Sequence, residues 1–436
     1  MALAAGTEPL RAVSGEGREL VERRFLLAFA VVTSLFFMWA IANNFNDILI
    51  KQFQKALELS RMESGLVQTA FYFGYFTFAL PAGWMITRLG YKAGIIIGLG
   101  LYATGAVMFY PAAEVRQFGF FLIALYIIAA GLAFLETAAN PLIAVMGPGR
   151  TAAQRLNLAQ SFNGLGGFLA PFMGGALIFS GIEHTPAELA AMSPARIDAY
   201  RATEALAVQA PYLGLAAIVI LLTVLVAILR FPKIEEATHS YNDVAHKPIW
   251  SFRHLRWAVV AQFFYVGAQV TVWSYFINFA QDLSGVGEKA AAHYLGISLM
   301  AFMIGRFAGT ALMRFVAPPR LLMFYGIAAA LLCAVAMATS GMVAIVALGL
   351  TSFFMSVMFP TIFALGVAEL GSRTKLGSSL LVMAIIGGAL FPPLTGLIGE
   401  RNQSLQIALI VPLVCFVVVA LFGRYMARWL AEREAR

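Results

Sequence analysis

Long apolar runs recur along the whole chain, and short polar segments separate them. The runs lie at about residues 25–50, 64–88, 93–112, 118–141, 156–181, 211–230, 256–280, 291–316, 320–340, 342–366, 376–399 and 405–429. A helix rises 1.5 Å per residue, so about 20 apolar residues cross the hydrocarbon core of a bilayer. The pattern therefore predicts an all-α polytopic membrane protein with twelve transmembrane helices.

Lysine and arginine residues concentrate in alternate loops between these runs. If both termini lie in the cytoplasm, most of the positive residues fall in cytoplasmic segments, as the positive-inside rule requires. The longest such loop divides the twelve helices into two halves of six. The expected organisation is a cytoplasmic tail (1–24), an amino-terminal half (25–230), a cytoplasmic linker (231–255), a carboxyl-terminal half (256–429) and a second cytoplasmic tail (430–436).

The two halves share short sequence patterns in the same order. The pairs are Gly83-x-x-x-x-Arg88 with Gly309-x-x-x-x-Arg314, Asn140-Pro141 with Phe359-Pro360, and Gly166-x-x-x-x-Pro171 with Gly388-x-x-x-x-Pro393. Repeated halves are typical of secondary transporters, whose substrate site lies between the repeats near the bilayer midplane.

The composition agrees with a membrane protein and excludes several other classes. Hydrophobic residues make up 61% of the chain and charged residues 12%, which is about half the charged fraction of soluble domains. The formal charge of +8 follows from the positive-inside rule, so it does not indicate nucleic-acid binding. The two cysteines, Cys333 and Cys415, lie in apolar runs and predict neither a disulfide nor a metal site. No phosphate-binding loop, nucleophile elbow or zinc-binding helix motif occurs, so we expect no ATP-driven pump, enzyme or cofactor.

The first apolar run ends with a cluster of polar residues. Trp39, Asn43, Asn44, Asn46 and Asp47 fall on about half of the helix circumference. A carboxylate at membrane depth is costly unless it faces water, a partner or a bound solute, and such residues are functional by default. The alternative is that the aspartate lies just outside the hydrocarbon, beside the lysines that follow it.

A second carboxyl group lies deep in the fourth run. Glu136 follows more than a dozen mostly apolar residues, and Asn140 lies one turn later on the same helix face. Desolvation favours the neutral form of this carboxyl group, which suits a proton carrier. The alternative is a structural carboxyl group that bonds a neighbouring helix and never titrates.

The fifth and seventh runs carry further polar and aromatic residues. They are Asn157, Gln160, Ser161 and Asn163 in the fifth run, and Gln262, Tyr265, Gln269 and Trp273 on one face of the seventh. Carboxamides both donate and accept hydrogen bonds, as sugar hydroxyls require, and aromatic rings suit the C–H face of a pyranose. Polar side chains also tie membrane helices together, so each residue alone has a structural alternative. The whole set favours a polar cavity.

Basic residues inside or beside the runs receive other roles. Arg306 is the one basic residue well inside a run, and we expect it to reach the interface or pair with a carboxylate rather than bind substrate. Four basic residues of the cytoplasmic loops are expected to hold one conformation by pairing between helix ends: Arg88, Lys92, Arg150 and Arg155.

Several long motifs resemble those of a known transporter family. They are Phe36-Phe-Met-Trp-Ala-Ile-Ala-Asn-Asn-Phe-Asn-Asp-Ile-Leu-Ile50, Gln68-Thr-Ala-Phe-Tyr-Phe-Gly-Tyr75, Leu135-Glu-Thr-Ala-Ala-Asn-Pro141, Leu156-Asn-Leu-Ala-Gln-Ser-Phe-Asn163 and Tyr265-Val-Gly-Ala-Gln-Val-Thr-Val-Trp-Ser-Tyr275. They resemble motifs of the bacterial fucose permeases, sugar:proton symporters in the fucose/glucose/galactose permease subfamily of the major facilitator superfamily. The resemblance runs from about Phe25 to the twelfth helix.

The resemblance implies a function and a set of site residues. It implies proton-coupled uptake of L-fucose or a related monosaccharide across the bacterial inner membrane by alternating access, and we expect a monomer. Asp47 and Glu136 resemble the family's coupling and recognition carboxylates. The full predicted sugar site comprises Trp39, Asn43, Asn44, Asp47, Glu136, Asn140, Gln160, Asn163, Tyr265, Gln269 and Trp273.

Two departures from the family pattern keep alternatives open. Thr87 stands where the superfamily loop usually has an acid, and Met358-Phe359 stands where the fucose permeases have Gln-Tyr. Loss of a carboxamide and a hydroxyl from a cavity wall leaves open glucose or galactose transport, which some animal relatives couple to sodium. From another class, a membrane sugar sensor without transport also remains open.

Overall fold

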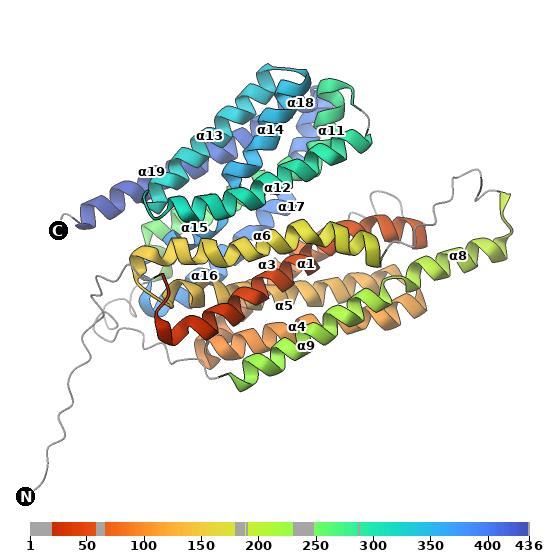
Figure 1. Ribbon diagram of the computed structural model, residues 1–436, viewed down its shortest axis with the longest axis horizontal. Helices are drawn as coiled ribbons and strands as arrows, with labels where there is room; N and C mark the ends of the chain where they lie inside the picture. Colours follow the sequence, from red (N-terminus) through yellow and green to blue (C-terminus); the bar gives the residue numbers. More distant parts are fainter. Residues whose placement is uncertain are drawn as a thin grey trace, which may run out of the picture.

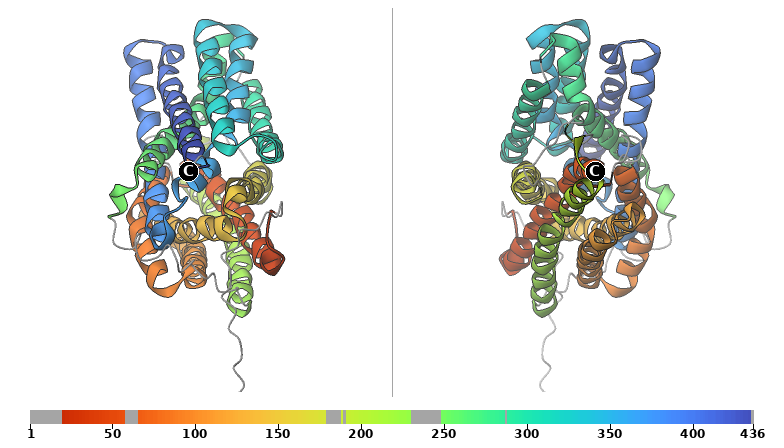
Figure 2. Two further views of the ribbon diagram at one scale, coloured as in Figure 1. Left: turned by 90° about the vertical axis from the view of Figure 1, so that its left-hand side faces the viewer. Right: turned by 90° about the vertical axis from the view of Figure 1, so that its right-hand side faces the viewer.

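The protein is described by a computed structural model that covers residues 20–57, 66–178, 188, 191–229, 248–286 and 288–434. Within these ranges every regular element is a helix. Two bundles of helices make up the molecule, and Figures 1 and 2 show one bundle above the other. We call the end of the molecule where α1 begins and α19 ends the terminal end, and the opposite end the distal end.

The amino-terminal bundle contains six long helices and three shorter elements. In chain order they are η1 (Arg23–Phe25), α1 (Leu26–Leu57), α3 (Leu66–Leu89), α4 (Tyr91–Val115), α5 (Phe118–Val145), η2 (Gly149–Thr151), α6 (Ala152–Leu177), α8 (Pro194–Leu206) and α9 (Gln209–Ile228).

The carboxyl-terminal bundle repeats the six spans, two of them broken. Its elements are η4 (Ile249–Ser251), α11 (Arg253–Ser284), α12 (Glu288–Leu312), α13 (Pro318–Ala338), α14 (Gly341–Met355), α15 (Met358–Gly366), η5 (Gly371–Arg373), α16 (Thr374–Met383), η6 (Ala384–Ile386), α17 (Gly387–Arg401), α18 (Leu405–Ala408) and α19 (Ile410–Glu434). Nine helices in the described part of the chain are long and apolar enough to cross a membrane. Together with the remaining long helices they confirm the predicted twelve-helix fold.

The tenth span breaks between α14 and α15, just before Pro360. Proline has no N–H, so the carbonyl four residues earlier, that of Ser356, lacks its usual helical donor. In membranes such a carbonyl must find another partner. Side chains from two other helices bond the break: Tyr265 Oη donates to the Met355 carbonyl (3.1 Å), and Arg306 Nε donates to the Ser356 carbonyl (3.0 Å).

The two bundles are joined near the terminal end by polar residues of α6. Gln154 Nε2 donates to the Thr310 carbonyl of α12 (3.2 Å), and Asn157 Nδ2 donates to Thr361 Oγ1 of α15 (3.0 Å). These residues are spaced by three and share a helix face. Figure 1 shows α6 and α12 close together near the terminal end and diverging toward the distal end.

A second contact between the bundles closes the same end. Helices α3 and α16 approach so closely at Gly83 that an added Cβ would collide with Ser379 and lie 3.2 Å from the Lys375 carbonyl oxygen. A glycine is therefore needed at this crossing. The terminal end of the interface between the bundles is consequently tightly packed.

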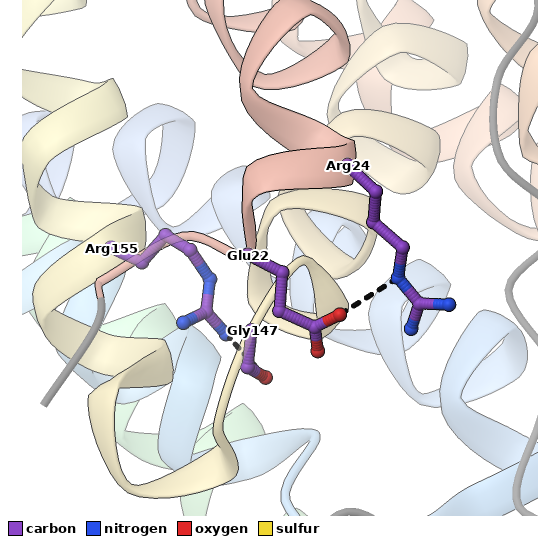
Figure 3. Close-up of polar contacts among 4 residues, drawn as sticks. All are labelled: Glu22, Arg24, Gly147 and Arg155. Carbon is purple, nitrogen blue, oxygen red and sulfur yellow. Dashed lines mark hydrogen bonds and ion pairs between the residues drawn. The ribbon is translucent and has the colours of Figure 1, made fainter. Parts of the chain in front are cut away.

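Arg155 locks the end of α5 to the start of α6. Its side chain is fully buried and donates to the carbonyls of Ile143 (2.7 Å) and Leu20 (2.8 Å), as well as to Gly147 (3.2 Å). Figure 3 shows its guanidinium group at the Gly147 carbonyl, beside an exposed ion pair of Glu22 with a neighbouring arginine. Arg155 thus satisfies carbonyls that the helix end leaves without a donor.

Replacing Arg155 with glutamine is expected to destabilise the protein by about 3 kcal/mol, because several charge-assisted hydrogen bonds to buried carbonyls are lost. Arg150, five residues earlier, is exposed and provides a matched control. The midpoint of thermal unfolding, followed by tryptophan fluorescence of purified protein, should fall clearly for Arg155→Gln and little for Arg150→Gln. Equal midpoints for both variants would contradict an anchoring role.

At the distal end, α8 packs against α1. This helix carries a buried carboxyl group, that of Glu204. Gln52 Nε2 donates to Glu204 Oε2 (2.7 Å) and to the Glu204 backbone carbonyl (2.8 Å). On the other side of α8, Arg116 pairs with Asp198 (2.7 Å). Helix α8 therefore braces the distal part of α1, the helix that carries Asn43 and Asp47.

Candidate functional site

Glu136 lies in the second half of α5. Its side chain is 8% exposed. Tyr75 of α3 donates from its hydroxyl to Glu136 Oε1 (3.1 Å), while Oε2 is buried without a hydrogen-bond partner among the described residues. The neighbouring Gly74 lets the two helices meet, since an added Cβ would lie 2.7 Å from the Ala129 Cβ. The carboxyl group thus has one anchored oxygen and one that is free to bind a hydroxyl or a proton.

A chain of hydrogen bonds leads from the helix of Glu136 to the other bundle. Asn140 lies one turn after Glu136 and accepts at Oδ1 from Gln160 Nε2 (3.1 Å). Arg306 Nη1 in turn donates to Gln160 Oε1 (3.2 Å) and to the Gln160 carbonyl. Asn140 Nδ2 has no partner among the described residues. Glu136, Asn140 and Gln160 thus lie close together, as the sequence analysis predicted.

Arg306 lies inside the protein and does not reach the membrane interface, which was one of the two outcomes that the sequence left open. The other outcome was a pair with a carboxylate, with no role assigned in substrate binding. The side chain of Arg306 is 4% exposed, and it bonds Gln160 of one bundle and the helix break at Ser356 of the other. Its guanidinium carbon also lies 4.7 Å from the centroid of the Phe302 ring, in a cation–π contact.

The residues predicted on α11 divide into two groups. Trp273 packs edge-on against Phe302 (ring centroids 4.9 Å apart), the ring that Arg306 also contacts, and its Nε1 donates to Ser352 Oγ (3.1 Å). The hydroxyl of Tyr265, in contrast, is engaged by the helix break, which gives it a structural role. Gln269 is half-buried, and no polar contact of its side chain is described.

One further residue of the predicted α11 face is Gln262. It is fully buried, and both atoms of its carboxamide lack a hydrogen-bond partner among the described residues. Unpaired buried amides are unusual and call for water or a ligand.

The residues predicted on α1 lie along its contact with α6. Trp39 is buried against Phe36 (ring centroids 4.1 Å apart). Asn163 Nδ2 donates to the Phe36 carbonyl (3.1 Å), and Asn44 Nδ2 donates to the Ala40 carbonyl (2.7 Å). Asn44 and Asn163 are both half-buried, so each keeps an amide oxygen for another partner.

The side chains of Asn43 and Asp47 lie outside the part of the chain that the structure describes. Their backbone belongs to α1, which places them one turn apart on the same side of that helix. No group of three or more potential metal ligands occurs among the described residues.

Comparison with known proteins places this geometry in a family. Residues 24–392 match the Major Facilitator Superfamily. The L-fucose-proton symporter of Escherichia coli K12 is 44% identical over 97% of this chain and 98% of its own length. A glucose/galactose transporter of Brucella abortus is 37% identical over 92% of this chain and 94% of its own length.

A solved structure of the major facilitator superfamily transporter FucP in the outward conformation superimposes on this chain with a TM-score of 0.85. The two sequences are 44% identical, and the superposition covers 93% of this chain and 99% of the FucP chain.

Proposed function

This chain belongs to the major facilitator superfamily, and we propose that it carries L-fucose or a closely related monosaccharide together with a proton across the bacterial inner membrane. The observation that carries this proposal is the buried Glu136 of α5, which has one oxygen without a hydrogen-bond partner among the described residues. The 44% identity to a relative named as an L-fucose-proton symporter supports the substrate and the coupling ion.

We assign sugar recognition to the polar groups around Glu136. The unpaired Glu136 oxygen accepts a hydrogen bond from a sugar hydroxyl, and the unpaired Asn140 Nδ2 donates a hydrogen bond to another hydroxyl. The Trp273 ring offers a flat apolar surface for the C–H face of the sugar. Trp39, Asn43, Asn44, Gln160, Asn163 and Gln269 complete the proposed site. We reassign Tyr265 to supporting the helix break, and we add Arg306 as the residue that orients Gln160.

Proton coupling is assigned to Asp47 and Glu136, following the family resemblance. A charged carboxylate at the bilayer centre is costly to move through an apolar barrier, whereas a protonated one is not. Sugar movement is coupled to proton movement if the carrier changes conformation only when these carboxyl groups are protonated or bound to sugar.

Alternating access then requires the bundles to separate at the terminal end. The contacts of Gln154, Asn157 and Gly83 with the other bundle hold this end closed. We propose that the structure corresponds to a state open at the distal end, in line with its similarity to an outward conformation. The termini would then lie in the cytoplasm, as the lysine and arginine distribution suggests, and the transporter would act as a monomer.

Replacing Arg306 with glutamine is expected to raise the Kd for the transported sugar about tenfold. The reason is that loss of one charge-assisted hydrogen bond, worth about 1.4 kcal/mol, frees the Gln160 amide from its fixed orientation. Arg306→Lys keeps the charge but loses the fork of donors, so its Kd should rise less. Tryptophan fluorescence titration measures both, and an unchanged Kd in Arg306→Gln would remove Arg306 from the site.

A second substrate is favoured by one specific observation. Met358 is buried and Phe359 lies beside Tyr265 (ring centroids 6.5 Å apart), where the fucose permeases have a carboxamide and a hydroxyl. A glucose or galactose transporter, with proton or sodium as the coupling ion, would fit this more apolar wall.

Competition in reconstituted vesicles distinguishes these substrates. Uptake of labelled L-fucose under a pH gradient should be inhibited most by unlabelled L-fucose, compared with galactose, arabinose and glucose. Stronger inhibition by glucose or galactose would favour the second substrate class. Uptake that depends on a sodium gradient rather than on a pH gradient would show that sodium is the coupling ion. No uptake of any of the four sugars would favour a sensor.

A further inference from the structure

A groove runs along the membrane-facing surface between α13 and α19, the ninth and twelfth spans. Its volume is about 530 Å³. Its lining residues are Met323, Ile327, Ala330, Leu331, Ala334, Leu413, Val417, Ala420, Leu421 and Arg424. Leu331 and Leu421 are 60% and 56% exposed, so the groove opens away from the protein core. Every lining residue is apolar except Arg424.

The length of the groove matches one leaflet of a bilayer. Its lining runs over twelve residues on each helix, from Leu413 to Arg424 on α19 and from Met323 to Ala334 on α13, and so over eleven helical rises. At 1.5 Å per residue this is about 16 Å, close to half of a hydrocarbon core of about 30 Å. The apolar part therefore suits an acyl chain that runs from the membrane surface toward the midplane.

A positive group stands at the surface end of the groove. Arg424 is exposed, and no polar partner is described for its side chain in the covered part of the chain. The first turn of α13, which carries the exposed Arg320, lies beside it, since a Cβ added at Gly423 would lie 3.0 Å from the Pro319 carbonyl oxygen. Basic pockets between membrane helices near the surface suit the phosphate of an anionic lipid.

The equivalent position in the other bundle is already occupied by protein. There Lys92, near the start of α4, donates to the carbonyls of Ala227 (2.7 Å) and Leu229 (2.9 Å), where α9 ends. Helix α19 continues to Glu434 and offers no such carbonyls beside Arg320 and Arg424. In the amino-terminal bundle the basic side chain at this position is therefore bound by backbone carbonyls, whereas in the carboxyl-terminal bundle the basic side chains lie exposed at the end of the groove.

We propose that this groove binds one anionic glycerophospholipid from the leaflet at the terminal end. One acyl chain lies between α13 and α19, and the phosphate is bound by Arg424 with Arg320 beside it. Charge complementarity selects an anionic lipid over a zwitterionic one. This site is separate from the sugar site between the bundles.

Native mass spectrometry of the full-length protein in detergent tests the proposal, with phosphatidylglycerol and phosphatidylethanolamine as probes. The parent protein should retain phosphatidylglycerol in preference to phosphatidylethanolamine. Arg424→Gln should reduce retention of phosphatidylglycerol about fivefold, the effect of one cation at an anionic surface. Arg401→Gln, which removes an exposed arginine at the distal end, should retain it like the parent.

A second pair of variants tests the apolar part of the groove without changing charge. Ala334→Trp fills the groove and should reduce retention of phosphatidylglycerol, whereas Val343→Trp, at a residue 60% exposed on α14, should not. The proposal is overturned by equal retention of the two lipids in the parent, by parental retention in Arg424→Gln or Ala334→Trp, or by an equal loss in either control.

Discussion

Replacing Glu136 with glutamine is expected to reduce sugar accumulation to the level of vesicles without protein. Glutamine keeps the size of the side chain and an oxygen that can accept the bond from Tyr75, so the packing of α3 against α5 should survive. The carboxamide cannot carry a proton, and its NH2 group replaces the oxygen that is now unpaired. The measurement is uptake of labelled L-fucose into reconstituted vesicles under an imposed pH gradient.

Tyr75→Phe provides a matched control for this experiment. It removes the hydroxyl that anchors Glu136 Oε1 but leaves the carboxyl group in place, at a cost of about 1 kcal/mol. This variant should still accumulate sugar, at a reduced rate. If Glu136→Gln accumulates sugar as well as the parent does, Glu136 is a structural residue and the proposed proton site is wrong.

Replacing Asp47 with asparagine is expected to separate sugar binding from proton coupling. Asparagine keeps the shape and one acceptor oxygen of aspartate, so the polar cavity should bind sugar nearly unchanged. A symporter must prevent the half-loaded carrier from changing conformation, and a carboxylate that is costly to bury when charged provides this block. With a neutral amide at residue 47, the carrier changes conformation without a proton.

Two assays on the same vesicles distinguish these roles of Asp47. The Asp47→Asn variant should exchange labelled for unlabelled sugar in counterflow, yet fail to concentrate sugar under a pH gradient. Asp47→Glu, which keeps a carboxyl group, should retain some accumulation. Full accumulation by Asp47→Asn would exclude a coupling role, and loss of both activities would show that the residue is needed for binding.

The core of the candidate site could be predicted because its residues share helix faces. Glu136 and Asn140 lie four residues apart, so their position on one face of α5 follows from helix geometry alone. The family motifs then predicted Gln160 for the same site, and its Nε2 donates to Asn140 directly. Helix spacing and long motifs are thus sufficient where the partners lie on one helix or within the family motifs.

Arg306 could not be placed from the sequence, because its partners are distant in the chain. Gln160 lies 146 residues away, and Ser356 lies 50 residues away. Pro360 was the available signal: it predicts a free carbonyl at Ser356, but not which side chain reaches it. Tyr75 belongs to one of the family motifs but was not predicted as a site residue. Its partner Glu136 is 61 residues away in the chain, so the sequence does not show that the two side chains meet.

The fold was predictable because hydrophobic length determines membrane spans almost by itself. The twelve apolar runs correspond to the twelve spans, and the break at α14 and α15 falls within a proline-containing run. The helix α8 was not predicted, because its residues are polar and its stability comes from contacts with α1 through Glu204. Such contacts depend on tertiary structure and leave no periodic signal in the sequence.

The pH of the medium around reconstituted vesicles tests the central claim most directly, because it reports the movement of protons with sugar. Adding L-fucose to vesicles without any imposed gradient should make the medium transiently alkaline, as protons enter together with the sugar. A protonophore should abolish the signal, and Glu136→Gln vesicles should show none. Uptake of labelled sugar by the parent protein without any change in external pH would contradict proton-coupled transport.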